Sequence, residues 1–196
     1  VKNGETIKLI LDIEENVTLT EKEGLNYTID GAGKTMNGTI TVKALSATDN
    51  TRRITINNIN FVETDNAKST TFISSVETNH YPRITVEGCT FTGSGDATDV
   101  ALRLKSSKNV EIKNCTGTGL HSFLQNTSGW NLTIENVTVT ESKSAFALGT
   151  VQGVTVKGAT IDVAGYGIRL DANTYNNNAV IADNNIKAFI PVVVRN

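Results

Sequence analysis

The chain has 196 residues, with 18 lysines and arginines against 20 aspartates and glutamates, and a formal net charge of −2. A near-neutral chain without a basic excess argues against nucleic acid as the main partner. No apolar run approaches the roughly 20 residues that a transmembrane helix needs. The length and the lack of helical periodicity favour one all-β domain over residues 1–196.

Residues 1–24 precede the regular pattern. Apolar and polar residues alternate from Thr6 to Leu19, which predicts an irregular first turn that covers the end of the core. Regular repeats then occupy residues 25–196. The threonine- and asparagine-rich composition is common in secreted solenoids, so we expect an extracellular or cell-surface protein, although no signal peptide is visible and Val1 looks like a mature or truncated start.

A five-residue unit that begins apolar, polar, apolar recurs along the chain, most clearly at residues 54–58. Copies begin at Tyr27, Ile84, Val110, Leu132, Val154 and Val180, the last with a register uncertain by one residue. The starts lie 22 to 30 residues apart, a period typical of solenoids and propellers. The alternation predicts one half-buried strand per unit. The third residues should form one buried column: Ile56, Val86, Ile112, Ile134 and Val156.

The fifth position of each unit holds glycine or asparagine, which both reach left-handed backbone conformation easily. This predicts a tight bend at each of Gly31, Asn58, Gly88, Asn114, Asn136 and Gly158. A second short alternating run follows most bends, as at residues 137–139, and a third follows after a variable gap, as at residues 146–148. Three strands per turn predict a parallel β-helix of about seven to eight coils.

The repeated units and residues 30–35 resemble the right-handed parallel β-helix, or pectin-lyase-like, superfamily. Residues 30–35 read Asp-Gly-Ala-Gly-Lys-Thr, similar to a segment common near the start of such helices. The resemblance covers nearly the whole chain and implies the fold, but the superfamily includes lyases, glycoside hydrolases, tailspikes and non-catalytic adhesins. No specific enzyme family matches, because the motifs of polygalacturonases and pectate lyases are missing. His121 is therefore expected to be a corner residue.

Cations surround the point where the chain enters the first strand. Arg53 and Arg83 take the same outward position on adjacent rungs, and Trp130 follows two rungs later. Such a strip could bind an acidic sugar. Alternatively, Glu77, Glu87 or a loop carboxylate neutralises the arginines and Trp130 covers a core edge, which is the reading we favour.

The longest insertions lie in two consecutive units and bring the carboxylates of Asp65, Asp96 and Asp99 to neighbouring rungs. Oxygen-rich loops suit Ca²⁺, but the spacing matches no defined calcium loop. We therefore expect solvated carboxylates and no cofactor, with Ca²⁺ as the alternative. Arg103 and Lys105 leave the third strand beside these loops.

The third strand also places Arg103 and Arg169 three rungs, or roughly 14 Å, apart. These two arginines could line one groove. Its predicted floor consists of Leu124, Asn126, Ala147 and Gly149.

Other outward positions form columns. One alternates in charge and should neutralise itself: Glu87, Lys113, Glu135, Lys157 and Asp183. Threonines recur on the first strand and again after the bend, at Thr90, Thr116, Thr138 and Thr160. Because charges interrupt the first column and a bend separates the two, they do not predict a flat ice-binding array. Cys89 and Cys115 occupy equivalent positions, which favours two buried thiols over a disulfide.

Two function classes remain. The first is a secreted or cell-surface module that contacts carbohydrate, or acts as an adhesin, without catalysis. The alternative is a polysaccharide lyase or glycoside hydrolase acting on an acidic polysaccharide. Enzymes of the superfamily usually have deep, loop-walled clefts, whereas the insertions here are short, so we expect binding of a polysaccharide or glycan surface without turnover. The expected contacts are the loop carboxylates Asp65, Asp96 and Asp99 together with Arg103 and Lys105.

Overall fold

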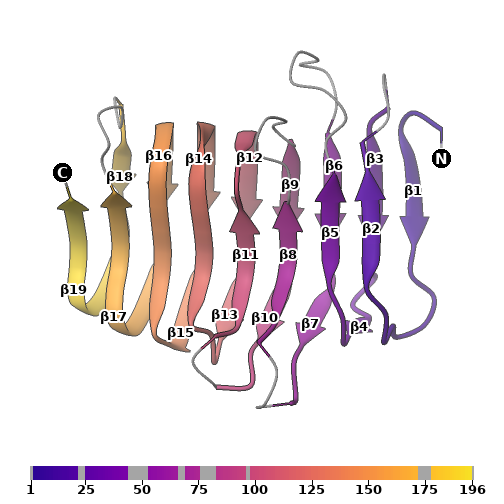
Figure 1. Cartoon of the computed structure of the whole chain (residues 1–196), viewed down its shortest axis with the longest axis horizontal. Helices are drawn as coiled ribbons and strands as arrows, with labels where there is room; N and C mark the ends of the chain where they lie inside the picture. The colour runs from indigo at the N-terminus through magenta and orange to yellow at the C-terminus, as the bar shows by residue number, and fades with distance from the viewer. Residues whose placement is uncertain are drawn as a thin grey trace.

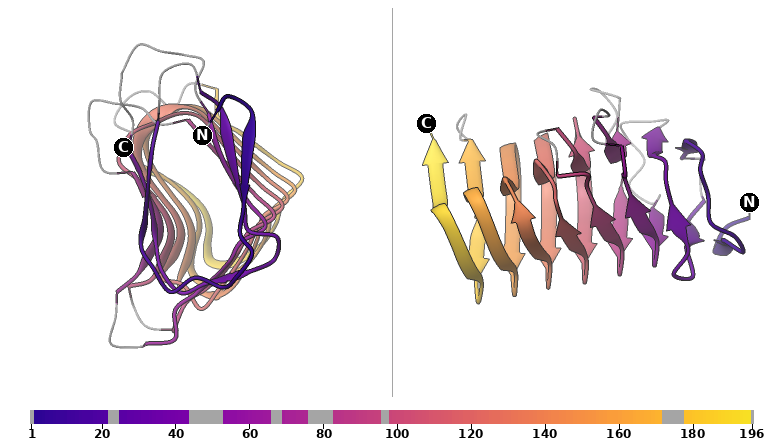
Figure 2. Two further views of the ribbon diagram at one scale, coloured as in Figure 1. Left: turned by 90° about the vertical axis from the view of Figure 1, so that its right-hand side faces the viewer. Right: turned by 90° about the horizontal axis from the view of Figure 1, so that it is seen from below.

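The structure, a computed structural model, describes residues 2–21, 25–43, 53–65, 69–75, 83–95, 98–171 and 178–195. All strands in these residues belong to one parallel stack of about seven turns. Figure 1 shows the chain advancing steadily from one end of the stack to the other. In the end-on view of Figure 2 the coils superpose around a common interior. The predicted all-β parallel solenoid is confirmed, and none of the described residues forms a helix long and apolar enough to cross a bilayer.

The first row of strands carries the five-residue units. It consists of β1 (Glu5–Lys8), β3 (Tyr27–Asp30), β6 (Ile54–Asn57), β9 (Ile84–Glu87), β12 (Ser107–Lys113), β18 (Val180–Ala182) and the later halves of β14 (Ser122–Glu135) and β16 (Ser144–Lys157). Neighbouring strands pair in parallel, with the third residue of each unit opposite the third residue of the next. The predicted buried column from Ile56 to Val156 is confirmed, because each of its five side chains is 0% exposed.

The second and third rows follow the predicted second and third runs. The second row contains β4 (Thr35–Met36), β7 (Asn60–Val62), β10 (Thr90–Thr92), β13 (Thr116–Thr118), β15 (Thr138–Ser142) and the first parts of β17 (Thr160–Asp171) and β19 (Asn185–Arg195). The third row contains β2 (Val17–Thr20), β5 (Ile40–Lys43), β8 (Thr71–Ser75), β11 (Val100–Leu104), the first halves of β14 and β16, and the later parts of β17 and β19. The longest strands therefore turn a corner and serve two rows.

Aromatic rings fill the interior behind the second and third rows. The rings of Phe61 and Phe91 stack with centroids 5.0 Å apart and planes 2° apart. The Phe123 ring packs edge-on against two others, with its centroid 5.6 Å from that of Phe91 and 5.9 Å from that of Phe146. Such pairs add about 0.5–1.5 kcal/mol beyond the area they bury. The aromatic rings thus form a continuous buried column behind these strands.

The predicted bends are left-handed at Asn58, Gly88, Asn114, Asn136 and Gly158, with φ between 52° and 66°. Asparagine side chains also link the bends, since Asn136 Nδ2 donates to Asn114 Oδ1 at 3.3 Å. The prediction is wrong at Gly31, because the left-handed residue is Ala32, with φ 52°. Gly31 is required for a different reason: a Cβ there would lie 2.3 Å from the carbonyl oxygen of Asn58.

The last first-row unit settles the uncertain register. Ile181 lies opposite Val156, and Ala182 lies opposite Lys157. Asp183 therefore takes the bend, with φ 56°, and is not part of the outward charged column as predicted. It still lies near that column, since its Oδ2 is 3.8 Å from Lys157 Nζ.

Residues 2–21 form the predicted first turn through β1 and β2. Ile13 and Val17 pack partly buried against the core. Ile10 and Leu11 instead face solvent, with 80% and 72% of their surface exposed. Part of this turn therefore contributes to the core, while its connecting segment stands away from it.

Candidate functional site

A polar hollow of about 450 Å³ lies on the outer face of the third row, across β14, β16 and β17. Its lining consists of His121, Ser122, Gln125, Asn126, Thr127, Ser144, Ala147, Gly149, Arg169 and Asp171. Hydroxyl, amide, guanidinium and carboxylate groups therefore surround this depression.

Two small residues create the depression. The outward column of this face runs from Arg103 through Gln125 and Ala147 to Arg169 on adjacent strands. Ala147 thus stands between two long side chains and leaves space above itself. At Gly149, two residues further along β16, a Cβ would lie 2.2 Å from the carbonyl oxygen of Thr127. The backbones approach too closely there for any side chain, so the floor stays low.

A forked ion pair bounds the hollow on the β17 side. Both Nε and Nη2 of Arg169 lie 2.9 Å from Asp171 Oδ2. Tyr166, on the same strand, lies between two cations: the Arg169 guanidinium is 6.0 Å from its ring centroid, and that of Arg195 is 5.2 Å away. Arg195 Nη2 also donates to the Tyr166 hydroxyl at 2.8 Å. This edge offers fixed donors, one carboxylate and an aromatic ring.

On the opposite side, Arg103 Nε donates to Gln125 Oε1 at 3.0 Å. That contact occupies the amide oxygen, so the Gln125 NH₂ group is the part free to donate toward the hollow. Arg103 and Lys105 are both exposed, as the sequence indicated. Of the predicted floor, Ala147 and Gly149 line the hollow. Leu124 does not, because it is fully buried.

Asn126 needs a separate description because its side chain faces the core. It lies in register between the buried residues Leu104 and Leu148 and is itself only 2% exposed. Its Nδ2 donates to Ser107 Oγ at 2.8 Å, while its Oδ1 has no hydrogen-bond partner among the described residues. Asn126 therefore borders the hollow through its backbone.

Two of the loop carboxylates, Glu63 and Asp99, both bind Thr70 and so act within the structure. Asp99 is fully buried: its Oδ1 accepts from the Thr70 amide at 2.9 Å, and its Oδ2 accepts from Ser94. Glu63 accepts from the Thr70 hydroxyl at 2.6 Å and from the Asp65 amide at 2.8 Å. These contacts join the two loops and withdraw Asp99 from any surface ligand.

Asp65 remains exposed, and Asp96 lies outside the described residues. Within the part of the chain that the structure describes, no three His, Cys, Asp or Glu side chains gather in a way that could hold a metal ion.

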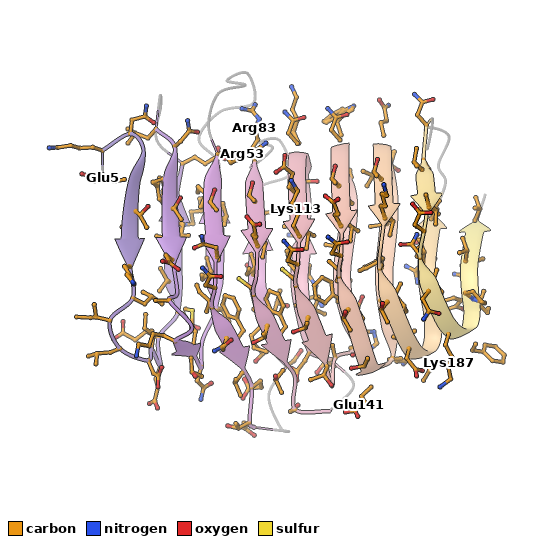
Figure 3. All side chains as sticks on the ribbon, turned by 180° about the vertical axis from the view of Figure 1, so that it is seen from behind. Glu5, Arg53, Arg83, Lys113, Glu141 and Lys187 are labelled. Atoms are coloured by element: carbon orange, nitrogen blue, oxygen red, sulfur yellow. The ribbon has the colours of Figure 1, made fainter. Side chains whose placement is uncertain are left out.

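The arginine strip is divided between surface and interior, and Figure 3 shows Arg53 and Arg83 near the same edge of the solenoid. Arg53 Nη1 lies 3.1 Å from Glu111 Oε2, a carboxylate that Lys113 also approaches at 3.3 Å. Arg83 is 4% exposed, and its amide donates to the buried carboxylate of Glu21 at 3.0 Å. Glu111 thus pairs with the Arg53 guanidinium, and Glu21 binds the backbone of Arg83. Glu77, one of the expected partners, lies outside the described residues.

Trp130 lies in register with Lys108 and Gln152 on the first row, and 37% of it is exposed. It belongs to a different row from the third-row hollow. The predicted site residues thus fall in three places: Arg103 and Lys105 beside the hollow, Asp65 and Asp99 in the loops, and Arg53, Arg83 and Trp130 along the first row.

Cys89 and Cys115 are both buried free thiols, as predicted. Each donates to backbone carbonyls, Cys115 Sγ to Lys113 at 3.1 Å. Burial raises the pKa of Cys89 to about 12 and that of Cys115 to about 11. Neither thiol is a nucleophile at neutral pH.

Sequence reasoning missed Gln125, Ser144 and Tyr166, which lie in or beside the hollow. Two small outward residues on one strand, Ala147 and Gly149, were the available signal. Comparison with known proteins adds nothing to this geometry: no family model, no curated protein and no solved structure matches the chain. The pectin-lyase-like resemblance is therefore one of repeat pattern, and the chain belongs, on its own structure, to the parallel β-solenoids.

Proposed function

We propose that this protein is a secreted or cell-surface solenoid module that binds a glycan in the third-row hollow without chemical turnover. The observation that carries the proposal is the hollow itself, with donors and acceptors around a floor of Ala147 and Gly149. Sugar hydroxyls both donate and accept hydrogen bonds, so they match a rim that contains Gln125, Ser144 and the Arg169–Asp171 pair. The hollow lies within the range of about 300–1,000 Å³ that small-ligand sites occupy, enough for a few sugar units.

The lining favours binding over hydrolysis. Hydrolysis of glycosidic bonds ordinarily uses a pair of carboxylates, and among the described residues that line the hollow Asp171 is the one carboxylate. Elimination from an acidic sugar needs a base, which an arginine does not supply, so the product analysis below tests His121, which also lines the hollow. Arg169 and Asp171 satisfy each other at 2.9 Å and so suit recognition.

The proposed glycan contacts lie in the third-row hollow and no longer include the loop carboxylates. Asp99 is buried in hydrogen bonds to the neighbouring loop. Arg103 stays in the proposal because it orients Gln125. Lys105 adds an exposed positive charge at the same edge.

A test that fills the hollow is sharper than one that removes charge. Ala147→Phe should abolish binding to whichever of a panel of immobilised acidic and neutral polysaccharides the unmodified protein binds. Thr155→Phe is the matched control, because it adds the same ring to the first-row half of the same strand. Equal binding by both variants would place the glycan elsewhere.

Charge removal and product analysis complete the test. Replacing both Arg103 and Lys105 with alanine should weaken binding less than Ala147→Phe, because both side chains lie at the rim. Ultraviolet absorbance should show no unsaturated product when the unmodified protein is incubated with its polysaccharide. Product formation would overturn the non-catalytic part of the proposal and leave the location of the site standing.

A further inference from the structure

The second row presents a different surface. Three consecutive strands each expose two threonines that flank an inward residue: Thr90 and Thr92 on β10, Thr116 and Thr118 on β13, and Thr138 and Thr140 on β15. The strands pair in register, so each threonine lies directly beside its counterpart. Thr160 of β17 extends the first column. We call these seven residues the threonine face.

This arrangement differs from the columns considered in the sequence. Those columns lay on opposite sides of a bend, which argued against one flat array. The structure adds a second column on the strands that carry Thr90, Thr116 and Thr138. This second column consists of Thr92, Thr118 and Thr140. Two columns of hydroxyls and methyls therefore share one face.

Aromatic packing from behind supports the strands of the threonine face. Phe61 and Phe91 stack beneath the first strands, with ring planes 2° apart. Beneath β13, a Cβ at Gly117 would lie 2.5 Å from Phe123 Cδ2, so the Phe123 ring occupies the space that a side chain would take. The second-row strands β7, β10, β13 and β15 pair without a register shift. The register first shifts where β15 pairs with β17, between Thr140 and Ser142.

The seven threonines are uncharged, and charged side chains border the face at one end, where Thr140 lines a hollow of about 770 Å³ together with Glu141, Lys143 and Asp162. In the second column, the residue that follows Thr140 on the next strand is the charged Asp162, which accepts a hydrogen bond from Lys187 Nζ at 2.8 Å. Thr90 donates to Asn60 and Thr118 donates to Glu141. Within the described part of the chain, the remaining threonine hydroxyls of the face make no hydrogen bond to protein. They are available to water.

The spacing resembles that of crystalline water. Adjacent strands lie about 4.8 Å apart, and alternate residues along a strand lie about 6.7 Å apart. With O–H···O distances of about 2.75 Å and tetrahedral angles, oxygens that share a neighbour lie about 4.5 Å apart, and the hexagonal lattice repeats at about 7.3 Å along its axis. Each protein spacing differs from the corresponding ice spacing by less than about 10%. Rotation of the threonine side chains can compensate for a difference of this size.

We infer that the threonine face binds the surface of ice. Its hydroxyls replace lattice waters, and its methyl groups sit in the gaps between them. The inference stands apart from the proposed glycan site, which lies on another row. A molecule that adsorbs to ice in this way slows the growth of large crystals from small ones.

The test measures recrystallisation of a frozen protein solution. Unmodified protein should inhibit crystal growth, and Thr138→Lys should lose that inhibition, because a long charged side chain keeps the face away from a flat lattice. Thr133→Lys is the matched control: Thr133 is an outward threonine of the same turn, on the first row, and its substitution should leave inhibition intact.

Thermal unfolding of both variants establishes that the solenoid is preserved. If unmodified protein fails to inhibit recrystallisation, the inference is wrong. Equal inhibition by Thr138→Lys and the unmodified protein would overturn it as well, because an ice-binding surface would then lie elsewhere.

Discussion

The second and third rows share one backbone plan and yet offer opposite surfaces. Both are parallel ladders with a one-to-one register across β13, β14, β15 and β16. On β10, β13 and β15 the second row carries pairs of threonines, and its charged residues lie at the edge of that face and beyond it. On the third row, Ala147 follows Gln125 and precedes Arg169, which leaves a hollow with a charged rim. In a solenoid, therefore, the change of side-chain size from rung to rung shapes the surface, and the backbone stays the same.

Ile134→Ala should have the largest effect, because it damages the scaffold that both rows share. Ile134 is fully buried, so its truncation leaves a cavity and should lower the free energy of unfolding by about 2–5 kcal/mol. Denaturant titration measures the loss. The neighbouring outward change Thr133→Ala should alter stability by less than about 0.5 kcal/mol. Equal losses would contradict the burial of the column.

The two thiols make stability depend on alkaline pH. Thiols in the unfolded chain have a pKa of about 8.5, whereas burial raises the pKa of Cys89 to about 12 and that of Cys115 to about 11. Above the unfolded pKa, unfolding releases protons that the folded thiols retain, so stability falls as the pH rises toward these values. Each thiol should contribute a loss of about 1–2 kcal/mol by pH 10.

The comparison for the thiols is a variant with both Cys89→Ala and Cys115→Ala, titrated with denaturant at pH 7 and pH 10. The unmodified protein should lose more stability than the variant between the two pH values. Parallel losses would mean that burial does not raise the pKa values of the two thiols.

Asn114 tests the bend that connects the first row to the second. Its φ is 53°, which a β-branched residue resists, so Asn114→Val should destabilise by about 1–2 kcal/mol. Asn114→Gly should be nearly neutral, because glycine reaches this conformation freely. Melting temperatures of the two variants give the answer. A valine variant as stable as the glycine variant would refute the assignment.

Asn126→Leu should have a smaller effect, of opposite sign. Asn126 lies between Leu104 and Leu148 with an unpartnered Oδ1, so leucine would continue the apolar column and remove a buried acceptor. We expect a gain of about 1 kcal/mol in unfolding free energy. Glycan affinity should not change, because the side chain faces away from the hollow. A loss of stability would point to a water that satisfies this oxygen.

Local patterns predicted the fold because strand alternation and left-handed bends depend on neighbouring residues. The same patterns failed at two bends: Asp183, which was expected in the charged column, takes one bend, and Ala32 takes another in place of Gly31. The burial of Asp99 depends on hydrogen bonds across two loops, which no short pattern encodes. The repeats already predicted the groove between Arg103 and Arg169 and the first threonine column. The position of Gln125 beside Ala147 and the second column at Thr92, Thr118 and Thr140 depend on the register between rungs, so they emerged from the structure.

The uneven length of the ladders has a consequence for how the molecule assembles. β14 pairs with β16 along nearly its whole length, from Ser122 to Glu135, whereas β4 and β7 share only the pairs Thr35–Asn60 and Met36–Phe61. In a stack where each rung contacts only its neighbours, order spreads outward from the strongest interface. We expect β14 and β16 to nucleate folding and their amides to exchange hydrogen with solvent most slowly, with exchange quickening toward β1.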